Sequence, residues 1–139
     1  MKLVLIAAGA LVAAFVAVTG WALESGGVAV IETRDADGGM RTTRVWYAEP
    51  DGELWLEAGT PENPWFVDVQ GDPAITFTSD AGPQQYVARA VEDPSGHSRI
   101  RSLLREKYGL RDRWIALIFD TSRSIAVRLV PAAQLKESP

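Results

Sequence analysis

The stretch MRTTRVWYAEPDGELWLEAG, from Met40 to Gly59, contains two β-strands and the turn that joins them. Threonine, valine and aromatic residues dominate its first part, Met40–Ala48, and such residues favour a pleated, half-buried strand. The segment EPDGE supplies the proline, aspartate and glycine of a hairpin turn. The chain then returns in Leu54–Gly59, so the stretch predicts an antiparallel hairpin.

The residues on both sides of this hairpin continue the same pattern. Further strands, flanked by turn residues, are predicted at Val28–Thr33, Ala74–Ser79, Gln84–Glu92 and Ser124–Pro131. Three prolines lie between Thr60 and Pro73, so a short helix around residues 65–69 is expected there rather than a strand. About six short antiparallel strands predict a mainly β (α+β) fold that forms a small closed or nearly closed barrel.

Two helices are predicted late in the chain. Asp93 and Pro94 have the chemistry of an N-cap and a first turn, and apolar residues then recur at helical spacing until Gly109. The segment LRDRWIALIF, residues 110–119, predicts a second, short helix. Its apolar residues from Trp114 to Phe119 are expected to be core; if they are exposed, they form a dimer or membrane contact.

The N-terminal residues Leu3–Leu23 carry no charge. At about 1.5 Å per residue, this run spans roughly 30 Å, which is the thickness of a bilayer core. We expect residues 1–24 to be a single-pass membrane anchor, residues 25–133 the barrel domain and residues 134–139 a polar tail. A cleaved signal peptide is the alternative, because small residues stand at positions 20 and 22. Lys2 and the arginines beyond residue 24 favour opposite orientations, so the side of the bilayer stays open.

Composition excludes several kinds of site. The chain has no cysteine and one histidine, which excludes a thiolate nucleophile and a multi-histidine zinc site. Residues 24–93 hold 14 acids and 4 bases, whereas residues 94–130 hold 3 acids and 8 bases. Most of the late cations form a basic cluster of Arg99, Arg101, Arg105, Lys107, Arg111 and Arg113. This cluster is a solvated helical face, or it binds lipid headgroups or a cofactor's anionic tail. A pI of about 5.0 argues against nucleic acid.

Two arginines stand on the strand Met40–Ala48. Side chains alternate along a strand, so Arg41 shares a face with Thr43 while Arg44 shares the other face with Trp46. An arginine that points into a barrel needs an anion, and guanidinium and hydroxyl groups together suit a phosphate or carboxylate. The alternative is that both arginines pair across strands with acids such as Glu32, Glu49 or Glu57.

The order of motifs from TRDADGGMRTTRVWY through the Pro-Asp-Gly hairpin, LWLEAG, PWFVDVQGDP, YVARAVEDP and SRSIAVRLVP resembles the deazaflavin-dependent nitroreductase family. That family belongs to the split β-barrel flavin and deazaflavin oxidoreductases, which are pyridoxamine-phosphate-oxidase-like. The resemblance implies a split barrel, often a homodimer, that binds F420, with FMN or heme as alternatives in relatives. It also implies that the cofactor-binding residues are Arg41, Thr43, Arg44, Val45, Trp46 and Trp65. In the family's first turn, bases are usual where this chain has Asp35 and Asp37.

The sequence therefore predicts a membrane-anchored oxidoreductase that transfers hydride between F420 or a flavin and a quinone-like or nitroaromatic acceptor. The alternative is a non-catalytic barrel that binds flavin, heme or a lipophilic ligand. No catalytic residue and no metal ligand set is predicted. His97 is expected at the surface, with an axial heme ligand as its alternative role. Asp68 and Asp72 are expected to lie in a solvated turn rather than to form an acid–base pair.

Overall fold

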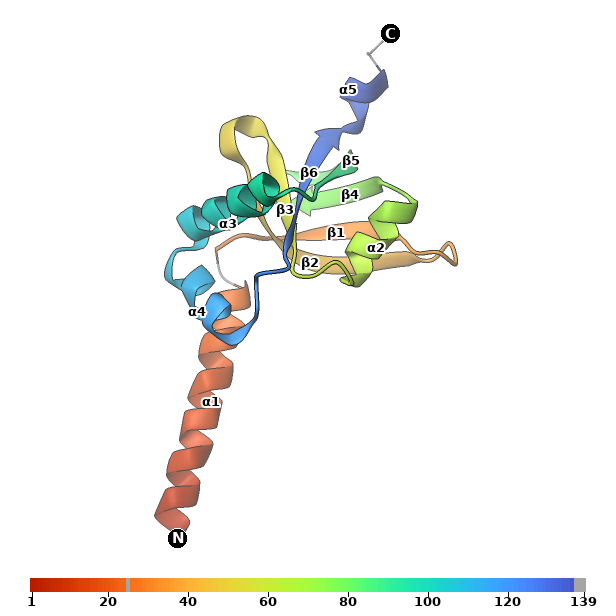
Figure 1. The fold of residues 1–139 in the computed structure, drawn as a ribbon. Coiled ribbons are helices and arrows are strands. Elements are labelled where there is room, and N and C mark those ends of the chain that lie inside the picture. Colours follow the sequence, from red (N-terminus) through yellow and green to blue (C-terminus); the bar gives the residue numbers. More distant parts are fainter. Residues whose placement is uncertain (25, 137–139) are drawn as a thin grey trace.

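The barrel predicted from the sequence is present in the computed structural model, which describes residues 1–24 and 26–136. Its strands pair in the closed order β1-β2-β3-β6-β5-β4, and every pairing is antiparallel (Figure 1). The strands are β1 (Val28–Arg34), β2 (Met40–Ala48), β3 (Leu54–Ala58), β4 (Ala74–Ser79), β5 (Gly82–Val91) and β6 (Ile125–Pro131). The helices are α1 (Lys2–Glu24), α2 (Pro64–Gly71), α3 (Pro94–Tyr108), α4 (Leu110–Ile118) and α5 (Ala132–Lys136), with a 3₁₀ turn η1 at Pro50–Gly52.

The turn between β1 and β2 explains why an acid stands where the family usually has a base. The Oδ1 atom of Asp35 accepts hydrogen bonds from the backbone N–H groups of Asp37 at 3.0 Å and Gly39 at 2.8 Å. A Cβ atom on Gly39 would lie 2.7 Å from the Asp35 carboxylate. Asp35 therefore holds the turn closed, and the register that follows pairs Ile31 with Thr43.

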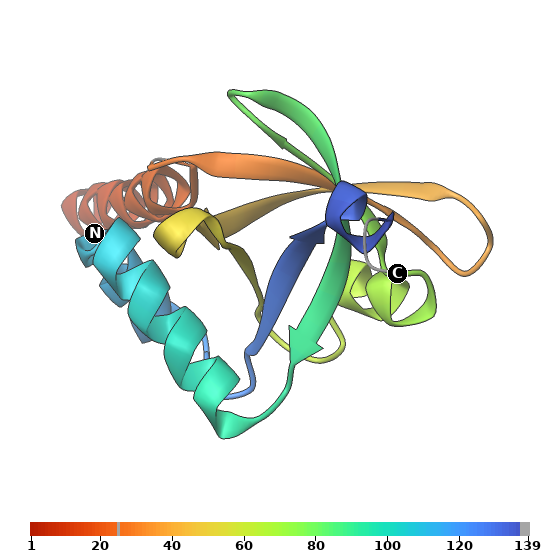
Figure 2. The ribbon, with the colours of Figure 1, turned by 90° about the horizontal axis from the view of Figure 1, so that it is seen from above.

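The barrel interior forms one of two apolar cores. Ile31, Leu56, Ile75 and Val127 are almost fully buried inside it, and α2 adds Trp65 and Phe66. The second core lies on the outer face, where α3 covers β2, β3 and β6 along one side of the barrel (Figure 2). Each strand is thus buried on one face by its neighbours in the barrel and, on this side, by α3 on the other.

The start and end of α3 follow the predicted signals. The Asp93 carboxylate accepts a hydrogen bond from the N–H of Gly96 at 2.9 Å, as an N-cap does. The helix ends at Gly109, whose φ of 56° and ψ of −118° suit glycine alone. This sharp break allows α4 to leave the axis of α3 and to pack beside α1.

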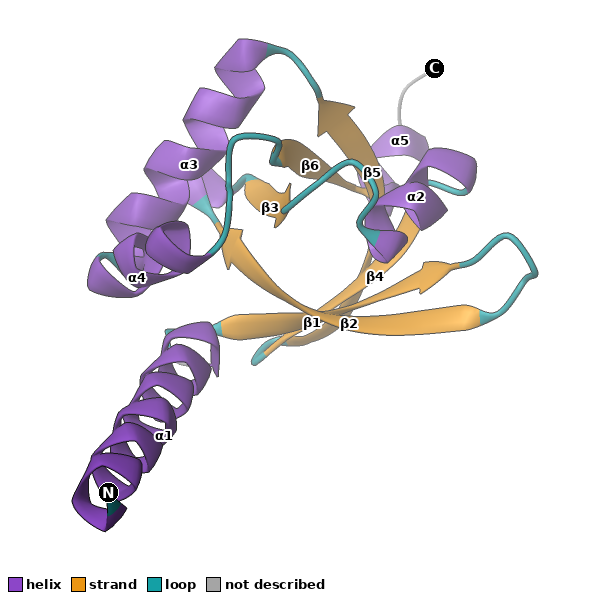
Figure 3. Ribbon diagram, turned by 60° about the horizontal axis from the view of Figure 1, so that its bottom comes forward, coloured by secondary structure: helices purple, strands orange, loops and turns teal. Residues whose placement is uncertain are grey.

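The expectation that α4 is a core helix is wrong. Its outer apolar side chains are exposed, with Leu117 82% and Phe119 just beyond the helix 52% accessible. None of the apolar residues of α4 belongs to either core. The reason is positional, because α4 lies beside α1, away from the barrel (Figure 3).

The helix α1 extends from one end of the barrel, and its N-terminus is far from the strands (Figure 1). It is long and apolar enough to cross a membrane, and its hydrophobic window is not buried by the rest of the protein. At the other end of the chain, α5 was not predicted. It includes residues 134–136 of the predicted polar tail, and residues 137–139 lie outside the described part.

Candidate functional site

A groove of about 350 Å³ lies along β2 at the end of the barrel that faces α1. Its volume is within the range of small-molecule sites. Five segments line it: Thr43–Trp46 with Val28, Glu57 with Gly59, Asn63 with Trp65, Leu23 of α1, and Ile115 of α4. It combines one cation, a hydroxyl, an amide and two indole rings with aliphatic side chains.

Because side chains alternate along β2, this strand contributes both buried apolar and exposed charged side chains to the groove. Val45 is buried in the barrel core, whereas Arg44 is exposed on the other face of the strand. Trp46 stacks on Tyr108 with ring centroids 4.2 Å apart, and its Nε1 donates to the carbonyl of Leu23 at 2.9 Å. Trp46 is therefore held between α3 and the end of α1, and it fixes one wall of the groove.

Trp65 forms the opposite wall. It is only 1% exposed and contacts Phe66 in an edge-to-face arrangement at 6.2 Å. Pro64 at the first helical position and Asn63 before it start α2 at this point, so the Pro-rich loop delivers both Asn63 and Trp65 to the groove.

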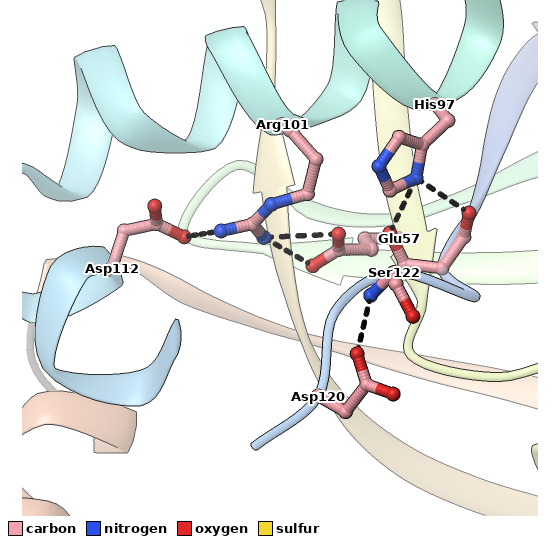
Figure 4. Close-up of polar contacts among 7 residues, drawn as sticks. Glu57, His97, Arg101, Asp112, Asp120 and Ser122 are labelled. Carbon is pink, nitrogen blue, oxygen red and sulfur yellow. Dashed lines mark hydrogen bonds and ion pairs between the residues drawn. The ribbon is translucent and has the colours of Figure 1, made fainter. Parts of the chain in front are cut away.

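Glu57 brings a negative charge to the groove, and Arg101 neutralises it (Figure 4). The Nη1 of Arg101 donates to both carboxylate oxygens of Glu57 at 3.0 Å, and its Nη2 donates to Asp112 at 2.6 Å. All three side chains are nearly buried. This ion triad joins β3, α3 and the start of α4, so it fixes the position of α4 relative to the groove.

The groove thus brings together five of the six residues predicted to bind a cofactor: Thr43, Arg44, Val45, Trp46 and Trp65. Arg41 lies outside it. The Arg41 Nε donates to Asp68 at 2.7 Å, and 39% of the arginine side chain is exposed. The role of Arg41 in binding an anion stays a prediction.

The sequence indicated that Asp68 lies in a solvated turn, and this expectation is wrong. Asp68 is buried on α2, and its Oδ2 also accepts a hydrogen bond from Thr33 at 2.8 Å. Burial acts to raise the pKa of Asp68, but the hydrogen bonds from Arg41 and Thr33 outweigh it, and the pKa lies below its usual value. Arg41 therefore has an acidic partner, and that partner is none of the three glutamates considered from the sequence.

A hollow of about 430 Å³ on the other side of Tyr47 and Tyr108 is larger but less suited to an anion. Glu49 and Glu106 line it together with Lys107. Lys107 is already engaged, because its Nζ donates to the Tyr47 carbonyl at 2.8 Å and lies 3.3 Å from the centre of the Tyr47 ring. Burial lowers the pKa of Lys107 to about 8.

His97 does not reach either hollow. Its Nδ1 lies 3.0 Å from the carbonyl oxygen and 3.1 Å from the hydroxyl of Ser124 (Figure 4). It joins the start of α3 to the start of β6. The position favours a structural role over an axial heme ligand.

Comparison with known families shows to which family the chain belongs. The model of the F420H(2)-dependent quinone reductase family matches residues 8–130. This protein belongs to that family. The resemblance found in the sequence is thereby confirmed, and F420 is the cofactor of the F420H(2)-dependent quinone reductase family to which the chain is assigned.

Solved structures confirm the barrel fold. A conserved hypothetical protein from Mycobacterium tuberculosis is 22% identical, with a TM-score of 0.59 over 84% of this chain and 79% of its own. A protein named F420 reductase is 15% identical, with a TM-score of 0.56 over 79% and 90% of the two chains. The heme storage protein HutZ from Vibrio cholerae is 13% identical, with a TM-score of 0.59 over 79% and 84%. No curated protein matches the chain in sequence.

The residues of the groove fit the cofactor of the F420H(2)-dependent quinone reductase family. F420 carries an aromatic ring system and an anionic tail, and the groove offers the Trp46 indole for the ring and Arg44, Thr43 and Asn63 for the anionic oxygens. Its volume suits a ring system rather than a whole tailed cofactor. No pattern in the sequence identifies Leu23, Glu57 or Ile115 as groove residues, because their place in the groove depends on how the helices pack.

Proposed function

We propose that this protein is a membrane-anchored reductase that passes hydride between F420 and a quinone-like acceptor in the groove along β2. The observation that carries the proposal is the meeting of Arg44, Thr43, Trp46 and Trp65 with apolar side chains of α1 and α4 around one groove. A quinone acceptor is preferred to a nitroaromatic one because it is the acceptor in the name of the matched family.

When bound, reduced F420 supplies the hydride, and the tasks of the protein are binding, orientation and exclusion of water. Arg44 offers a charged fork to anionic oxygens, and the Thr43 hydroxyl and the Asn63 amide can add hydrogen bonds. Trp46 is half-buried and fixed by its stacking on Tyr108, so it presents a planar surface against which a ring can be oriented, whereas the almost fully buried Trp65 supports the opposite wall.

Leu23 and Ile115 line the groove on the side of α1 and α4 with apolar atoms, which disfavour water beside a reacting ring. Glu57 is the acid on the wall, and its ion pair with Arg101 reduces the repulsion that a free carboxylate would exert on an anionic cofactor. The quinone takes up a hydride and a proton, and no side chain of the groove is assigned as the source of that proton.

Anchoring through α1 is the second part of the proposal. Three contacts favour an uncleaved helix over a removable signal peptide: Trp46 binds the Leu23 carbonyl, Trp114 binds Thr19, and Arg111 lies 5.7 Å from the ring centre of Trp21. Cleavage after position 22 would remove Thr19 and Trp21, which are the partners in two of these three contacts. A homodimer, which the resemblance implies, stays a proposal.

The test uses the full-length protein in detergent micelles. F420 binding is measured by fluorescence polarisation of the cofactor, with FMN and heme titrated in parallel by absorption. We then expect F420H2-linked reduction of menadione at a rate that depends on protein concentration. Binding of heme or FMN without turnover would favour the non-catalytic barrel, and failure to bind any of the three would refute both functions.

A further inference from the structure

The short helix α4 has an exposed apolar surface that neither core uses. Leu110 is 75% exposed, Leu117 82%, Ile118 36% and Phe119, just after the helix, 52%. Among its residues Asp112 is the one that is buried. A helix that exposes most of its large aliphatic side chains is unfavourable in water unless something covers them, so this surface calls for a partner.

The position of α4 beside α1 indicates what that partner is. The Trp114 ring lies 5.7 Å from the Phe15 ring, and its Nε1 donates to the Thr19 hydroxyl at 3.1 Å. Phe15 precedes the end of α1 by nine residues, or roughly 13 Å at about 1.5 Å per residue. If α1 spans a bilayer, α4 therefore lies level with its last turns, at the boundary between headgroups and acyl chains.

The polar groups at this contact are satisfied in a way that suits an apolar medium. The Thr19 hydroxyl donates to the carbonyl of Phe15 at 2.8 Å and accepts from Trp114. The single acid of α4, Asp112, is turned away from the exposed surface and bound to Arg101. Both atoms of the Trp114–Thr19 pair can thus enter a lipid environment without losing a hydrogen bond.

The charges around α4 match an anionic membrane surface. Arg111 and Arg113 flank Asp112 on α4, and the exposed Arg105 lies in the last turn of α3. Arg113 is exposed, and the Arg111 guanidinium lies over the ring of Trp21, a residue type common at the membrane interface. Cations beside exposed leucine and phenylalanine side chains are the pattern of interfacial helices.

We propose that α4 is a second membrane contact, which lies in the interface and inserts Leu117, Ile118 and Phe119 into the lipid beside α1. This inference rests on the proposed anchoring by α1. It also deepens the proposed function, because Leu23 and Ile115 belong both to the groove and to these two helices. The groove then opens at the lipid surface, and its acceptor is a lipid-dissolved quinone that arrives from the bilayer rather than from water.

Because the chain has no cysteine, a single introduced cysteine can be labelled selectively and its depth in the bilayer measured. Single-cysteine variants Leu117→Cys, Leu11→Cys and Val67→Cys are labelled with an environment-sensitive dye in the full-length protein. The proteins are reconstituted in vesicles of phosphatidylcholine and phosphatidylglycerol. Quenching by spin-labelled lipids is compared with quenching by iodide. Val67 is the matched control, since it is an apolar residue on α2 that is 51% exposed.

We expect spin-labelled lipid to quench the dye at position 117 and iodide to leave it largely unaffected, with the reverse at position 67. Iodide quenching at position 117 together with lipid quenching at position 11 would overturn the role of α4 and leave the anchor intact. Iodide quenching at positions 117 and 11 would overturn the anchor as well. Protection at position 117 from both quenchers would show that a second copy covers α4, which also contradicts the proposal.

A second variant tests the consequence for the acceptor. Leu117→Glu combined with Phe119→Glu adds two charges outside the groove. Because charge is costly at membrane depth, reduction of a quinone with an isoprenoid tail in vesicles should fall about tenfold or more. Reduction of menadione, which lacks the isoprenoid tail and also reaches the protein from the water phase, should be unchanged. An equal loss with both quinones, or none with either, would contradict delivery from the bilayer.

Discussion

The guanidinium of Arg101 on α3 donates a hydrogen bond across 2.6 Å to Asp112 at the start of α4, and both side chains are almost entirely buried. The same guanidinium binds Glu57 on the wall of the groove. Two carboxylates thus depend on one cation, and among the described residues the second oxygen of Asp112, Oδ2, has no hydrogen-bond partner. The position of α4 and the charge of the groove are set by one side chain.

Replacement of Arg101 is therefore expected to lower the free energy of unfolding strongly. Arg101→Met leaves two buried carboxylates without their cation, which typically costs about 3–5 kcal/mol of the free energy of unfolding. The measurement is urea denaturation of the full-length protein in detergent, followed by tryptophan fluorescence.

Arg128→Met is the matched control, because Arg128 also binds a glutamate, Glu53, which directly precedes β3. Arg128 and Glu53 are about half exposed, and we expect a loss of at most about 0.5 kcal/mol. Equal losses in the two variants would show that burial of the triad is not what matters.

Because of Asp68, the free energy of unfolding should decrease at acidic pH. Its pKa is lowered in the folded protein, so it contributes stability above the pKa of an ordinary aspartate that is lost as the pH falls through the lowered value. Asp68→Asn should lower stability at neutral pH and flatten the decline below about pH 4. Thermal unfolding between pH 2 and pH 7 in buffers of matched ionic strength, about 0.1 M, measures this. An unchanged acid limb would mean that the ion pair with Arg41 does not form in solution.

The fold could be predicted from the sequence because it is set by local patterns. The hairpin Met40–Gly59 carries alternating residues and a Pro-Asp-Gly turn, and β2 begins and ends at the predicted residues. Asp93 and Gly109 likewise mark the ends of α3. These signals act over a few residues, so no knowledge of distant contacts is needed to interpret them.

The site could be predicted only in part. Its β2 residues and Trp65 came from the resemblance, whereas Glu57 and Ile115 are brought to the groove by long-range packing. The apolar run of α4 was expected in the core because sequence hydrophobicity does not distinguish a protein interior from an exposed apolar surface. Asp68 was placed in a turn because its partner, Arg41, is 27 residues away in the chain.

Lys107 predicts an effect of the same sign at alkaline pH, because the pKa of this group is also lowered in the folded protein. Its pKa is lowered to about 8 when folded and is near 10.5 in an unfolded chain. Between these values the unfolded state binds more protons, so the contribution of this group to stability rises with pH. We expect a rise in unfolding free energy between pH 8 and about 9.5 that is absent in Lys107→Met. Burial raises the pKa of Tyr108 from 10.0 to about 12, so this group lowers stability chiefly between these two values, above the pH range of the Lys107 effect.

Arg44 is the cation of the groove, and its replacement should act on binding rather than folding. Loss of a charged hydrogen bond is worth about 1.5–3 kcal/mol, so Arg44→Met should raise the Kd for F420 about 10- to 100-fold. Arg89→Met is the control, because Arg89 is also an exposed arginine on a barrel strand but lies outside the groove. Fluorescence polarisation at several salt concentrations measures both, and the salt dependence of binding should weaken in the Arg44 variant alone. Equal affinities in the two variants would place the anionic part of F420 elsewhere, with the exposed guanidinium of Arg41 as the next residue to replace.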